Sequence, residues 1–304
     1  QSVSQLYRRA NLFISVGQIV LVYLTSYIAF TTIQEGTLFQ LNLAPLGLFM
    51  LNGLLMLFVQ PLIYIYERLF GLVSDVSLLE LSDTNSNLLK ELSDKAPGTF
   101  HHSLQVANLA EAAANEIGAN TLLVRVGALY HDIGKLKAPM YFSENQTGIL
   151  SPHEELTPKQ SAEVIINHVL DGIAIAQKNK IPDRIIDFIR THHGTSMVYY
   201  FYKKQEELTP DAVKIGDFRY PGPKPFSKET AILMMADAVE AASKSLKAPN
   251  VNELQQFVEK IIDGKMSELQ FNSSDITFAE IETVKKVLFK KLINVYQLRI
   301  EYPE

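Results

Sequence analysis

Seven polar side chains of the kinds that bind metal ions lie within or at the ends of strongly apolar segments. They are His102, His131, Asp132, His168, His192, His193 and Asp237. Burying a carboxylate such as Asp237, in "ILMMADAVEA", is costly unless it is paired or bound to a cation. Imidazoles and carboxylates together suit iron, manganese and other divalent transition metals. The set is large enough for two such ions if one carboxylate bridges them.

Each of these residues also has a simpler structural explanation when it is taken alone. His131, at the end of the apolar part of "ALYHDIGK", would be favourable at the negative end of a helix dipole. His168 would pass for a hydrogen-bonded core residue. Neighbours such as His192 and His193 diverge by about 100° on a helix, so the pair need not serve one ion. The combination favours a metal site, because the residues come from five predicted helices and helical bundles build such sites from inward-facing side chains.

Predicted helices position these side chains. One runs from Thr99, as its N-cap, to about Ile117, where Gly118 stops it, and a second runs from Thr121 to about His131. The other predicted helix starts are Thr157 with Pro158, Pro182, Ser227, and the capping box Thr277–Glu280. No series of strands with a period of two is visible, although "KIGDFRYPGPKP" is expected to hold a short irregular hairpin. The pattern predicts an all-α protein.

Two long uncharged segments precede these helices. Leu12–Ile33 has 22 residues without a charge, and Leu41–Tyr66 has 26. Each is long enough to cross roughly 30 Å of hydrocarbon as a helix. Polar residues and Pro61 in the second segment indicate that it packs against other helices rather than facing lipid alone. We therefore expect a transmembrane helical hairpin over residues 1–68, embedded in a lipid bilayer.

Charged residues at the ends of the two spans predict their orientation. Arg8 and Arg9 precede the first span and Arg68 follows the second, while the loop between the spans carries only Glu35 as a charge. By the positive-inside tendency, both ends of the hairpin face the cytoplasm. The part of the chain that follows is then expected to lie in the cytoplasm.

That following part is expected to consist of a connector and a soluble domain. A connector helix over 69–92 leads away from the bilayer and can pair across a homodimer, and the soluble domain follows over 93–304. From Leu69 onward the chain has six more acidic than basic residues, which argues against a nucleic-acid polymer as partner. Cysteine is absent, which rules out thiolate ligands and fits a reducing compartment.

The order of the metal-binding residues resembles the signature of HD-domain metal-dependent phosphohydrolases. His102, then "HD" at 131–132, then Asp237 make up that signature, and the additional histidines resemble the HD domains that hold two metals. Longer stretches such as "GALYHDIGKLKAPMYFSENQ" and "FRYPGPKPFSKETAILMMADAVEAA" resemble the seven-transmembrane HD receptors of the PgpH type. Members of that family hydrolyse the second messenger cyclic di-AMP to linear pApA. The two uncharged segments resemble the last two of the family's seven spans, so we expect a C-terminal fragment of a longer protein.

The resemblance implies a ligand set and a mechanism. One metal would be held by His102, His131, Asp132 and Asp237, and the other by Asp132, His168, His192 and His193. Asp132 would bridge the two ions and so take a catalytic role. The cofactors would be two divalent metal ions, iron or manganese, which turn a water molecule into a hydroxide nucleophile for phosphodiester hydrolysis.

Contacts to the substrate are expected from residues around the metal ligands. Lys135, about one turn beyond Asp132, is either a catalytic and substrate-binding cation for a phosphate oxygen or a solvated lysine at a helix end. Asn145 would hydrogen-bond an adenine edge, Thr195 would touch the phosphate or the sugar, and Arg219 would balance the second phosphate. Aromatic residues that either stack on a base or pack in the core are Tyr199, Tyr200 and Tyr202.

Other functions also fit parts of this sequence. Cyclic di-GMP hydrolases of the HD-GYP kind carry a "GYP" segment after the histidine pair, where this chain has "HHGTSMVYYFY". Guanosine tetraphosphate hydrolases with HD domains use one metal and lack the extra histidines. A non-catalytic receptor that senses a nucleotide would be expected to have lost ligands. The leading prediction is a membrane-anchored cyclic di-AMP phosphodiesterase.

Overall fold

The computed structural model describes residues 9–36, 42–146, 151–210, 213–246 and 249–296. Within these residues, the regular structure consists of α-helices and short 3-10 helices, which confirms the all-α prediction. One isolated β-bridge joins Met197 to Arg219. The segment expected to form a hairpin therefore pairs with the chain after the histidine pair rather than with itself. The chain divides into two units, residues 1–79 and 80–304.

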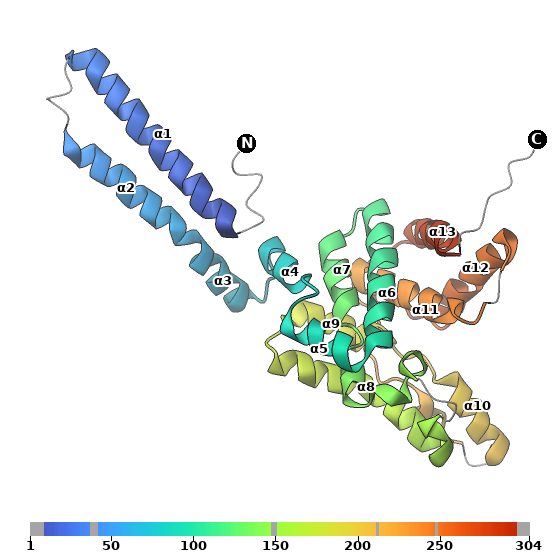
Figure 1. Cartoon of the computed structure of the whole chain (residues 1–304). Helices are drawn as coiled ribbons and strands as arrows, with labels where there is room; N and C mark the ends of the chain where they lie inside the picture. The colour runs from blue at the N-terminus through green and yellow to red at the C-terminus, as the bar shows by residue number, and fades with distance from the viewer. Residues whose placement is uncertain (1–8, 37–41, 147–150, 211–212, 247–248, 297–304) are drawn as a thin grey trace, which may run out of the picture. The chain divides into compact units, whose positions relative to one another are not determined.

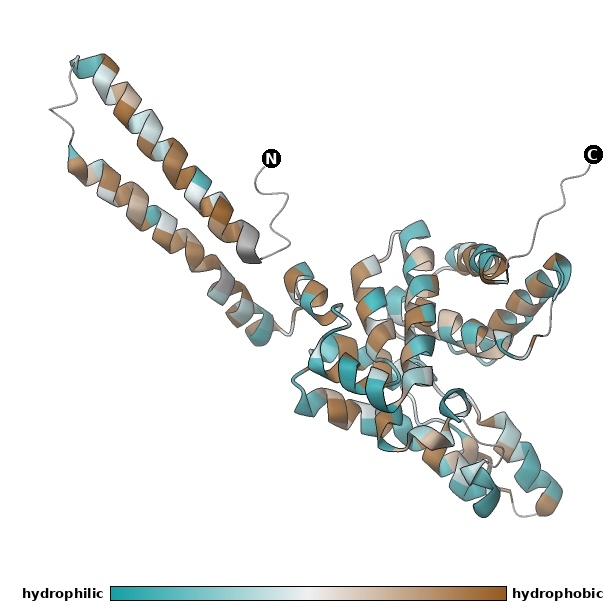
Figure 2. Cartoon of the chain, viewed as in Figure 1, coloured by the Kyte–Doolittle hydropathy of each residue, from teal (hydrophilic) through white to brown (hydrophobic). Residues whose placement is uncertain are grey.

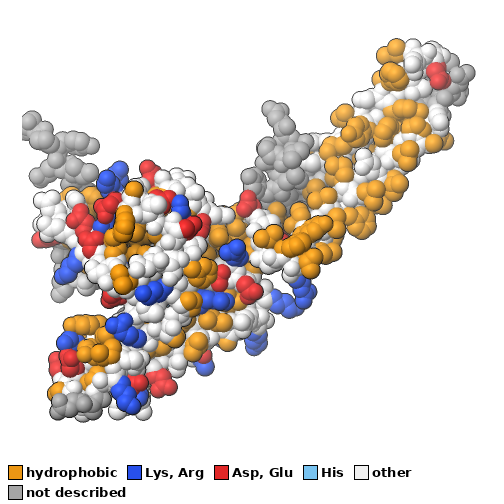
Figure 3. Space-filling model, turned by 180° about the vertical axis from the view of Figure 1, so that it is seen from behind, with side chains coloured by type: hydrophobic (Ala, Val, Ile, Leu, Met, Phe, Trp, Pro, Cys, Tyr) orange, Lys and Arg blue, Asp and Glu red, His pale blue; other side chains and the backbone are white. Residues whose placement is uncertain are grey.

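The first unit contains the apolar helices. They are α1 (Arg9–Glu35), α2 (Leu43–Leu57) and α3 (Val59–Phe70), and α1 packs against α2 (Figure 1). Two stretches, Leu12–Glu35 and Leu43–Phe70, are long and apolar enough to cross a membrane, and few of their residues are buried within the protein. Apolar residues run along these helices (Figure 2), and their side chains form a largely hydrophobic surface (Figure 3).

Two residues shape this part of the chain. Gly53 lies against α1, where a Cβ atom would clash with Val20 Cγ2, so glycine permits the close approach of the two helices. Pro61 has no N–H to donate to the carbonyl oxygen of Leu57. Helix α2 ends at Leu57, and α3 begins at Val59. The second predicted span is therefore interrupted at Phe58, three residues before its proline.

The prediction of one connector helix over 69–92 is wrong. Helix α3 ends at Phe70, and Gly71 follows with a left-handed φ of 62°, which glycine adopts without steric cost. The chain then forms two separate short helices, α4 (Asp75–Leu81) and α5 (Asn87–Lys95). The continuous helix on which the expected homodimer rested does not form in this stretch, all of which the structure describes.

The second unit is a helical bundle around α6. Helix α6 (Pro97–Glu116) packs against α7 (Thr121–Tyr130), α11 (Lys228–Ser243) and α13 (Phe278–Val295). Figure 1 shows α6 and α7 side by side. The remaining elements are η3 (Ile133–Lys137), η4 (Pro139–Tyr141), η5 (Ser143–Asn145), η6 (Pro152–Glu155), α8 (Pro158–Lys178), α9 (Asp183–Thr191), α10 (Tyr199–Leu208), η8 (Ile215–Phe218) and α12 (Val251–Ser267).

Three of the predicted helix starts are confirmed by their capping interactions. Thr157, Ser227 and Thr277 each accept a hydrogen bond from the N–H three residues later, which completes capping boxes at α8, α11 and α13. The prediction for Thr99 is wrong, because α6 begins at Pro97 and Thr99 is buried inside its first turn. Proline at the first helical position has a preset φ and needs no hydrogen-bond partner there.

The segment after the HD pair is not α-helical and packs against α8. Helix α7 gives way to the 3-10 helix η3 over 133–137. A Cβ atom on Gly134 would overlap the carbonyl oxygen of His168 and crowd the amide nitrogen of Gly172. The backbone of η3 therefore rests directly on the backbone of α8. This contact sets Asp132, two residues before the glycine, beside α8.

Candidate metal centre

The seven predicted ligands meet at one place inside the second unit. They come from α6, the end of α7, α8, the end of α9, and α11. Six are buried, and the side chain of His193 is 26% exposed. Their potential ligand atoms form two groups, each within 4.8 Å: His102, His131 and Asp237 in one, and His168, His192 and His193 in the other.

Asp132 lies between the two groups and turns one carboxylate oxygen toward each. Its Oδ2 atom is 3.5 Å from His102 Nε2 and 3.3 Å from His131 Nε2. Its Oδ1 atom is 3.3 Å from His168 Nε2 and 3.6 Å from His192 Nε2. A carboxylate placed in this way can bridge two ions.

Backbone carbonyl groups orient three of the imidazoles. The Nδ1 atoms of His131, His168 and His192 lie 2.7, 2.5 and 2.8 Å from the carbonyl oxygen three residues earlier. An N–H at Nδ1 donates to that oxygen and leaves Nε2 as the free nitrogen. Metal-binding histidines are commonly held in this manner, with the second ring nitrogen fixing both the tautomer and the ring orientation.

His102 is oriented by a carboxylate instead. Its Nδ1 atom is 2.5 Å from Glu240 Oε2, and its Nε2 atom is 3.0 Å from Asp237 Oδ1. Glu240 follows Asp237 by three residues on α11, so the two carboxylates lie on one face of the helix. A carboxylate behind a histidine raises the basicity of its ligating nitrogen. The sequence signal for Glu240 was a second acid three residues after the first in an apolar helix.

Both aspartates of the cluster are ionised despite their burial. Burial would raise the pKa of Asp132, but the charges of Lys135 and His131 hold it well below its usual value. Burial would also raise the pKa of Asp237, but a hydrogen bond from His102 and the nearby charge of His131 hold it well below its usual value. Burial would lower the pKa of His131, but Asp132 and Asp237 raise it to about 10. The carboxylates therefore favour positive charge at this place.

The donor atoms fit divalent metal ions. Among the described residues, His131 Nε2 and Asp132 Oδ1 are buried without a hydrogen-bond partner, and such atoms are rare and costly in folded proteins. Burial lowers the pKa of His192 and of His193, which favours the neutral imidazole that metals require. One unpartnered atom thus lies in each group, His131 Nε2 in the first and Asp132 Oδ1 beside His168 and His192 in the second.

Lys135 closes the cluster on the side of η3. Its Nζ atom is 2.7 Å from Asp132 Oδ2 and 2.7 Å from Glu144 Oε1. Burial would lower the pKa of Lys135, but the two carboxylates raise it, so the side chain is a fixed cation. The ring of Phe142 packs under this ammonium group and edge-on against His168. The described part of the loop after the HD pair therefore lies against the cluster.

Comparison with known proteins places this cluster in a family. Residues 99–242 match the HD domain, and residues 1–74 match the "7TM receptor with intracellular HD hydrolase". The crystal structure of the HD domain of phosphodiesterase PgpH from L. monocytogenes is 47% identical, with a TM-score of 0.67, over 70% of this chain and 100% of that one. The chain belongs to the PgpH family of HD-domain proteins.

Longer members of the PgpH family extend the similarity. The cyclic-di-AMP phosphodiesterase PgpH of Listeria monocytogenes is 44% identical over 98% of this chain and 42% of its own length. That of Bacillus subtilis is 45% identical over 85% of this chain and 37% of its own length. The chain thus spans less than half the length of these two relatives. Together with helices α1 to α3, the match to the 7TM receptor family indicates a membrane protein.

Two of the substrate contacts predicted for this PgpH-family site lie at its rim, and one does not. Thr195 follows the histidine pair, and Arg219 Nη1 donates to its carbonyl oxygen at 3.1 Å. Asn145 is buried, accepts from Thr99 N at 3.1 Å, and donates to Thr99 Oγ1 at 2.8 Å and to a backbone carbonyl at 3.3 Å. Its amide ties η5 to α6 and has no hydrogen left for an adenine edge, so we do not propose it as a base contact.

A second aromatic residue beside the ligands of the PgpH-family site, besides Phe142, is Tyr220. Its ring stacks on His193 with centroids 4.2 Å apart and meets His168 edge-on at 6.1 Å. Tyr199 and Tyr200 are largely exposed on α10, and in the described part of the chain neither ring touches a ligand histidine. Sequence reasoning missed Tyr220 because the bridge that carries its segment to the site joins residues far apart in the sequence.

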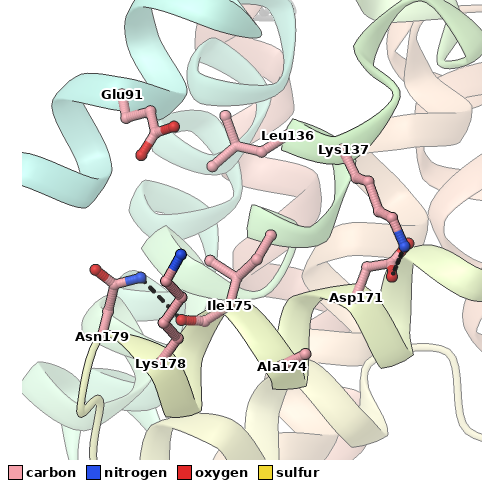
Figure 4. Close-up of a pocket in the computed structure, with 8 residues that line it drawn as sticks. All are labelled: Glu91, Leu136, Lys137, Asp171, Ala174, Ile175, Lys178 and Asn179. Carbon is pink, nitrogen blue, oxygen red and sulfur yellow. Dashed lines mark hydrogen bonds and ion pairs between the residues drawn. The ribbon is translucent and has the colours of Figure 1, made fainter.

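A separate pocket lies beside η3 and contains none of the seven residues (Figure 4). It has a volume of about 380 Å³ and is lined by parts of α5, η3 and α8. Lys137 pairs with Asp171 at 2.7 Å, as Figure 4 shows. The other lining residues are Glu91, Leu136, Ala174, Ile175, Lys178 and Asn179. With lysines and acids but no histidine, this pocket differs in chemistry from the metal centre.

Proposed function

We propose that this chain is the catalytic part of a membrane-anchored phosphodiesterase that hydrolyses cyclic di-AMP to linear pApA. The observation that carries the proposal is the buried cluster of five imidazoles and two aspartates with unpartnered atoms facing inward. The substrate is supported by the relatives, which are cyclic-di-AMP phosphodiesterases. A crystal structure of the L. monocytogenes PgpH HD domain in complex with cyclic-di-AMP is 48% identical, with a TM-score of 0.67, over 71% of this chain and 99% of that one.

The cofactors we propose are two divalent metal ions, iron or manganese, which suit imidazole and carboxylate donors. One would be held by His102, His131, Asp132 and Asp237, and the other by Asp132, His168, His192 and His193. When bound, such ions supply an activated water molecule and neutralise charge on the reacting phosphate. Asp132, with one oxygen toward each group, would be the ligand shared by both ions.

The chain's own residues prepare the site for this chemistry. Backbone carbonyls and Glu240 set the imidazoles in place before the substrate binds, so little reorganisation accompanies the reaction. Lys135 is held by Asp132 and Glu144, and we assign it to a phosphate oxygen as a fixed positive charge. At the rim, Thr195 and Arg219 are assigned to the sugar and phosphate groups of the dinucleotide.

We infer further that the protein crosses the membrane more than once and keeps its HD domain in the cytoplasm. Helix α1, and α2 together with α3, are each long enough to span a bilayer. Arg8, which lies outside the described residues, and Arg9 precede the first span, and Arg68 ends the second. Short flanks rich in arginine favour the cytoplasmic side. The match of residues 1–74 to a 7TM receptor with an intracellular HD hydrolase supports the same arrangement.

A substrate panel tests the proposed activity. The purified 304-residue chain in detergent, supplied with manganese or ferrous ion, would be incubated with cyclic di-AMP, cyclic di-GMP and guanosine tetraphosphate. We expect pApA from cyclic di-AMP as the main product, measured by chromatography. Faster hydrolysis of a guanosine nucleotide than of cyclic di-AMP would show that the guanosine nucleotide is the substrate. Binding of cyclic di-AMP without turnover of any substrate would favour the nucleotide-sensing receptor.

Two adjacent histidines give a matched pair of variants for the site. His102 is buried against Glu240 and Asp237, whereas its neighbour His101 is exposed. His102→Ala should reduce hydrolysis and metal content more than about 100-fold, since it removes a ligand rather than a partner of a ligand. His101→Ala should retain both. Equal behaviour of the two variants would show that the cluster is not the catalytic centre.

A further inference from the structure

Lys265 is a half-buried lysine for which the chemistry above has no use. It lies on α12, and its Nζ atom donates to Ser196 Oγ at 2.7 Å. Among the described residues, no carboxylate forms an ion pair with it. Burial lowers the pKa of Lys265, while the charges of Glu268 and Asp237 raise it. Partial burial of an ammonium group that forms no ion pair is costly, and an anion placed against Nζ would reduce that cost.

The partner of Lys265 belongs to the turn that carries a predicted metal ligand. Ser196 is buried, and its backbone N–H donates to the carbonyl oxygen of His193 at 3.0 Å. Gly194 lies between them with a left-handed φ of 51°. Asp237, at the centre of the cluster, acts on the charge of Lys265. The ammonium group is therefore tied to the edge of the metal centre on the side of the histidine pair.

The end of α12 is fixed against this same turn. Gln270 is fully buried, and its side chain accepts from Thr195 N at 3.1 Å and donates to Thr195 Oγ1 at 3.1 Å. A Cβ atom on Gly194 would clash with Gln270 Oε1. The turn and the segment after α12 thus hold one another in register. Lys265, five residues before Gln270, needs little reordering to meet a ligand, which lowers the entropic cost of binding.

Two lysines therefore lie near the cluster on different elements, Lys135 in contact with Asp132 and Lys265 in contact with the turn after the histidine pair. Lys135 comes from η3 and is already neutralised by Asp132 and Glu144. Lys265 comes from α12, and within the described parts of the chain its ammonium group bonds the hydroxyl of Ser196 and no carboxylate. An ammonium group has three donors and no acceptor, so Lys265 has donors left for anionic oxygens. A cyclic dinucleotide carries two phosphates. The metals and Lys135 would bind the phosphate that is cleaved, which leaves the second phosphate for another cation.

We propose that Lys265 binds an anionic oxygen of the second, uncleaved phosphate of the substrate, with Ser196 as the residue that positions its ammonium group. This assignment rests on the proposed function, since it presumes a substrate with two phosphates. It gives the site a contact that a mononucleotide phosphodiester lacks. Lys265 then contributes to the choice of a cyclic dinucleotide over smaller phosphodiesters.

The test compares Lys265→Met with Lys260→Met, an exposed lysine on the same helix, in the full chain loaded with manganese. The substrates are cyclic di-AMP, with two phosphates, and bis(p-nitrophenyl) phosphate, with one. For cyclic di-AMP we expect KM to rise about 10- to 100-fold in Lys265→Met, the worth of a hydrogen bond to a charged group, with a much smaller change in kcat. For bis(p-nitrophenyl) phosphate the loss should be far smaller. Lys265→Arg should retain part of the affinity.

Binding of cyclic di-AMP in the presence of a chelator separates this proposal from the proposed function. Weaker binding by Lys265→Met than by Lys260→Met supports the assignment of Lys265. If the wild-type chain supplied with metal binds cyclic di-AMP but does not cleave it, only the proposed phosphodiesterase activity is rejected. Equal KM and equal affinity in the two variants would reject the role of Lys265. Equal losses for both substrates would reject the second phosphate as its ligand. Failure of the wild-type chain to bind or cleave cyclic di-AMP would reject both.

Folding of the variants is controlled by circular dichroism and metal content. Lys265→Gln serves if Lys265→Met does not fold, because glutamine keeps an N–H donor and removes the charge, on a side chain shorter by one bond. Ser196→Ala should raise KM less than Lys265→Met, since it loosens the ammonium group without removing it. If Lys265→Gln loses activity only in proportion to a fall in its metal content, Lys265 has a structural role in the metal centre. That result would overturn the proposal.

Discussion

Replacing Glu240 by glutamine tests how the protein tunes a predicted metal ligand. Glu240 Oε2 lies 2.5 Å from His102 Nδ1, and both side chains are at least nine-tenths buried. Glutamine keeps the size of the side chain and can still accept the hydrogen bond, but it removes the negative charge. Lys244 Nζ, 3.1 Å from the same oxygen, would then face the imidazole without a carboxylate between them.

The expected loss of metal affinity is about 10- to 100-fold, or about 1.4 to 2.8 kcal/mol, the usual cost of changing the partner behind a ligating histidine. Lys244 adds repulsion, because its Nζ atom is 3.4 Å from His102 Nδ1. Its side chain is 48% exposed, so solvent screens much of that charge. The double variant Glu240→Gln, Lys244→Met should therefore recover at most about 5-fold.

The assay is a competition for manganese between the chain and a chelator of known affinity. Glu163→Gln is the matched control, because Glu163 is exposed on α8 and loses the same charge away from the cluster. Circular dichroism would establish that each variant is folded. Wild-type affinity in Glu240→Gln, or an equal loss in the control, would refute the reasoning that Glu240 tunes His102.

Three further outcomes are expected. In Gly134→Ala the new Cβ would overlap the carbonyl oxygen of His168, so urea denaturation should show a loss of about 3 kcal/mol; an unchanged midpoint would mean that η3 is free to move. Hydrogen bonds from Lys228 and Thr277 lower the pKa of Glu280 to about 2. The ionised carboxylate therefore stabilises the folded state at pH values above the pKa of glutamate in the unfolded chain. This stabilisation is lost as the pH falls toward 2. Lys228→Met should make the melting temperature less sensitive to pH in that acidic range, and identical slopes would exclude this ion pair. Removing manganese with a chelator should cost about 2.7 kcal/mol of stability if the ion was present at 100 times its Kd, whereas an unchanged melting temperature would mean that no ion had been bound.

Much of the architecture could be inferred from local patterns. Charge-free length indicated the two helical stretches that are long and apolar enough to cross a membrane. Threonine or serine at the N-cap, followed by Pro158 in α8 and by the capping-box acid Glu280 in α13, predicted the starts of α8, α11 and α13 correctly. The prediction of one connector helix failed for a reason that was also local. Gly71 could have been interpreted as a helix end, and α3 does end next to it. Thr99 failed because a proline two residues earlier is the better start.

The sequence alone also identified the seven residues that could bind metal, because a charged or imidazole side chain in an apolar helix needs a partner wherever that helix packs. Tertiary structure decided how these residues are arranged. Contact between the backbones of Gly134 and α8 brings Asp132 between the two groups of histidines. Packing also engages the amide of Asn145 and sets Tyr220 and Lys265 beside the turn of the histidine pair. These placements join segments 25 to 70 residues apart, roughly, and no helical or strand period carries information over such separations.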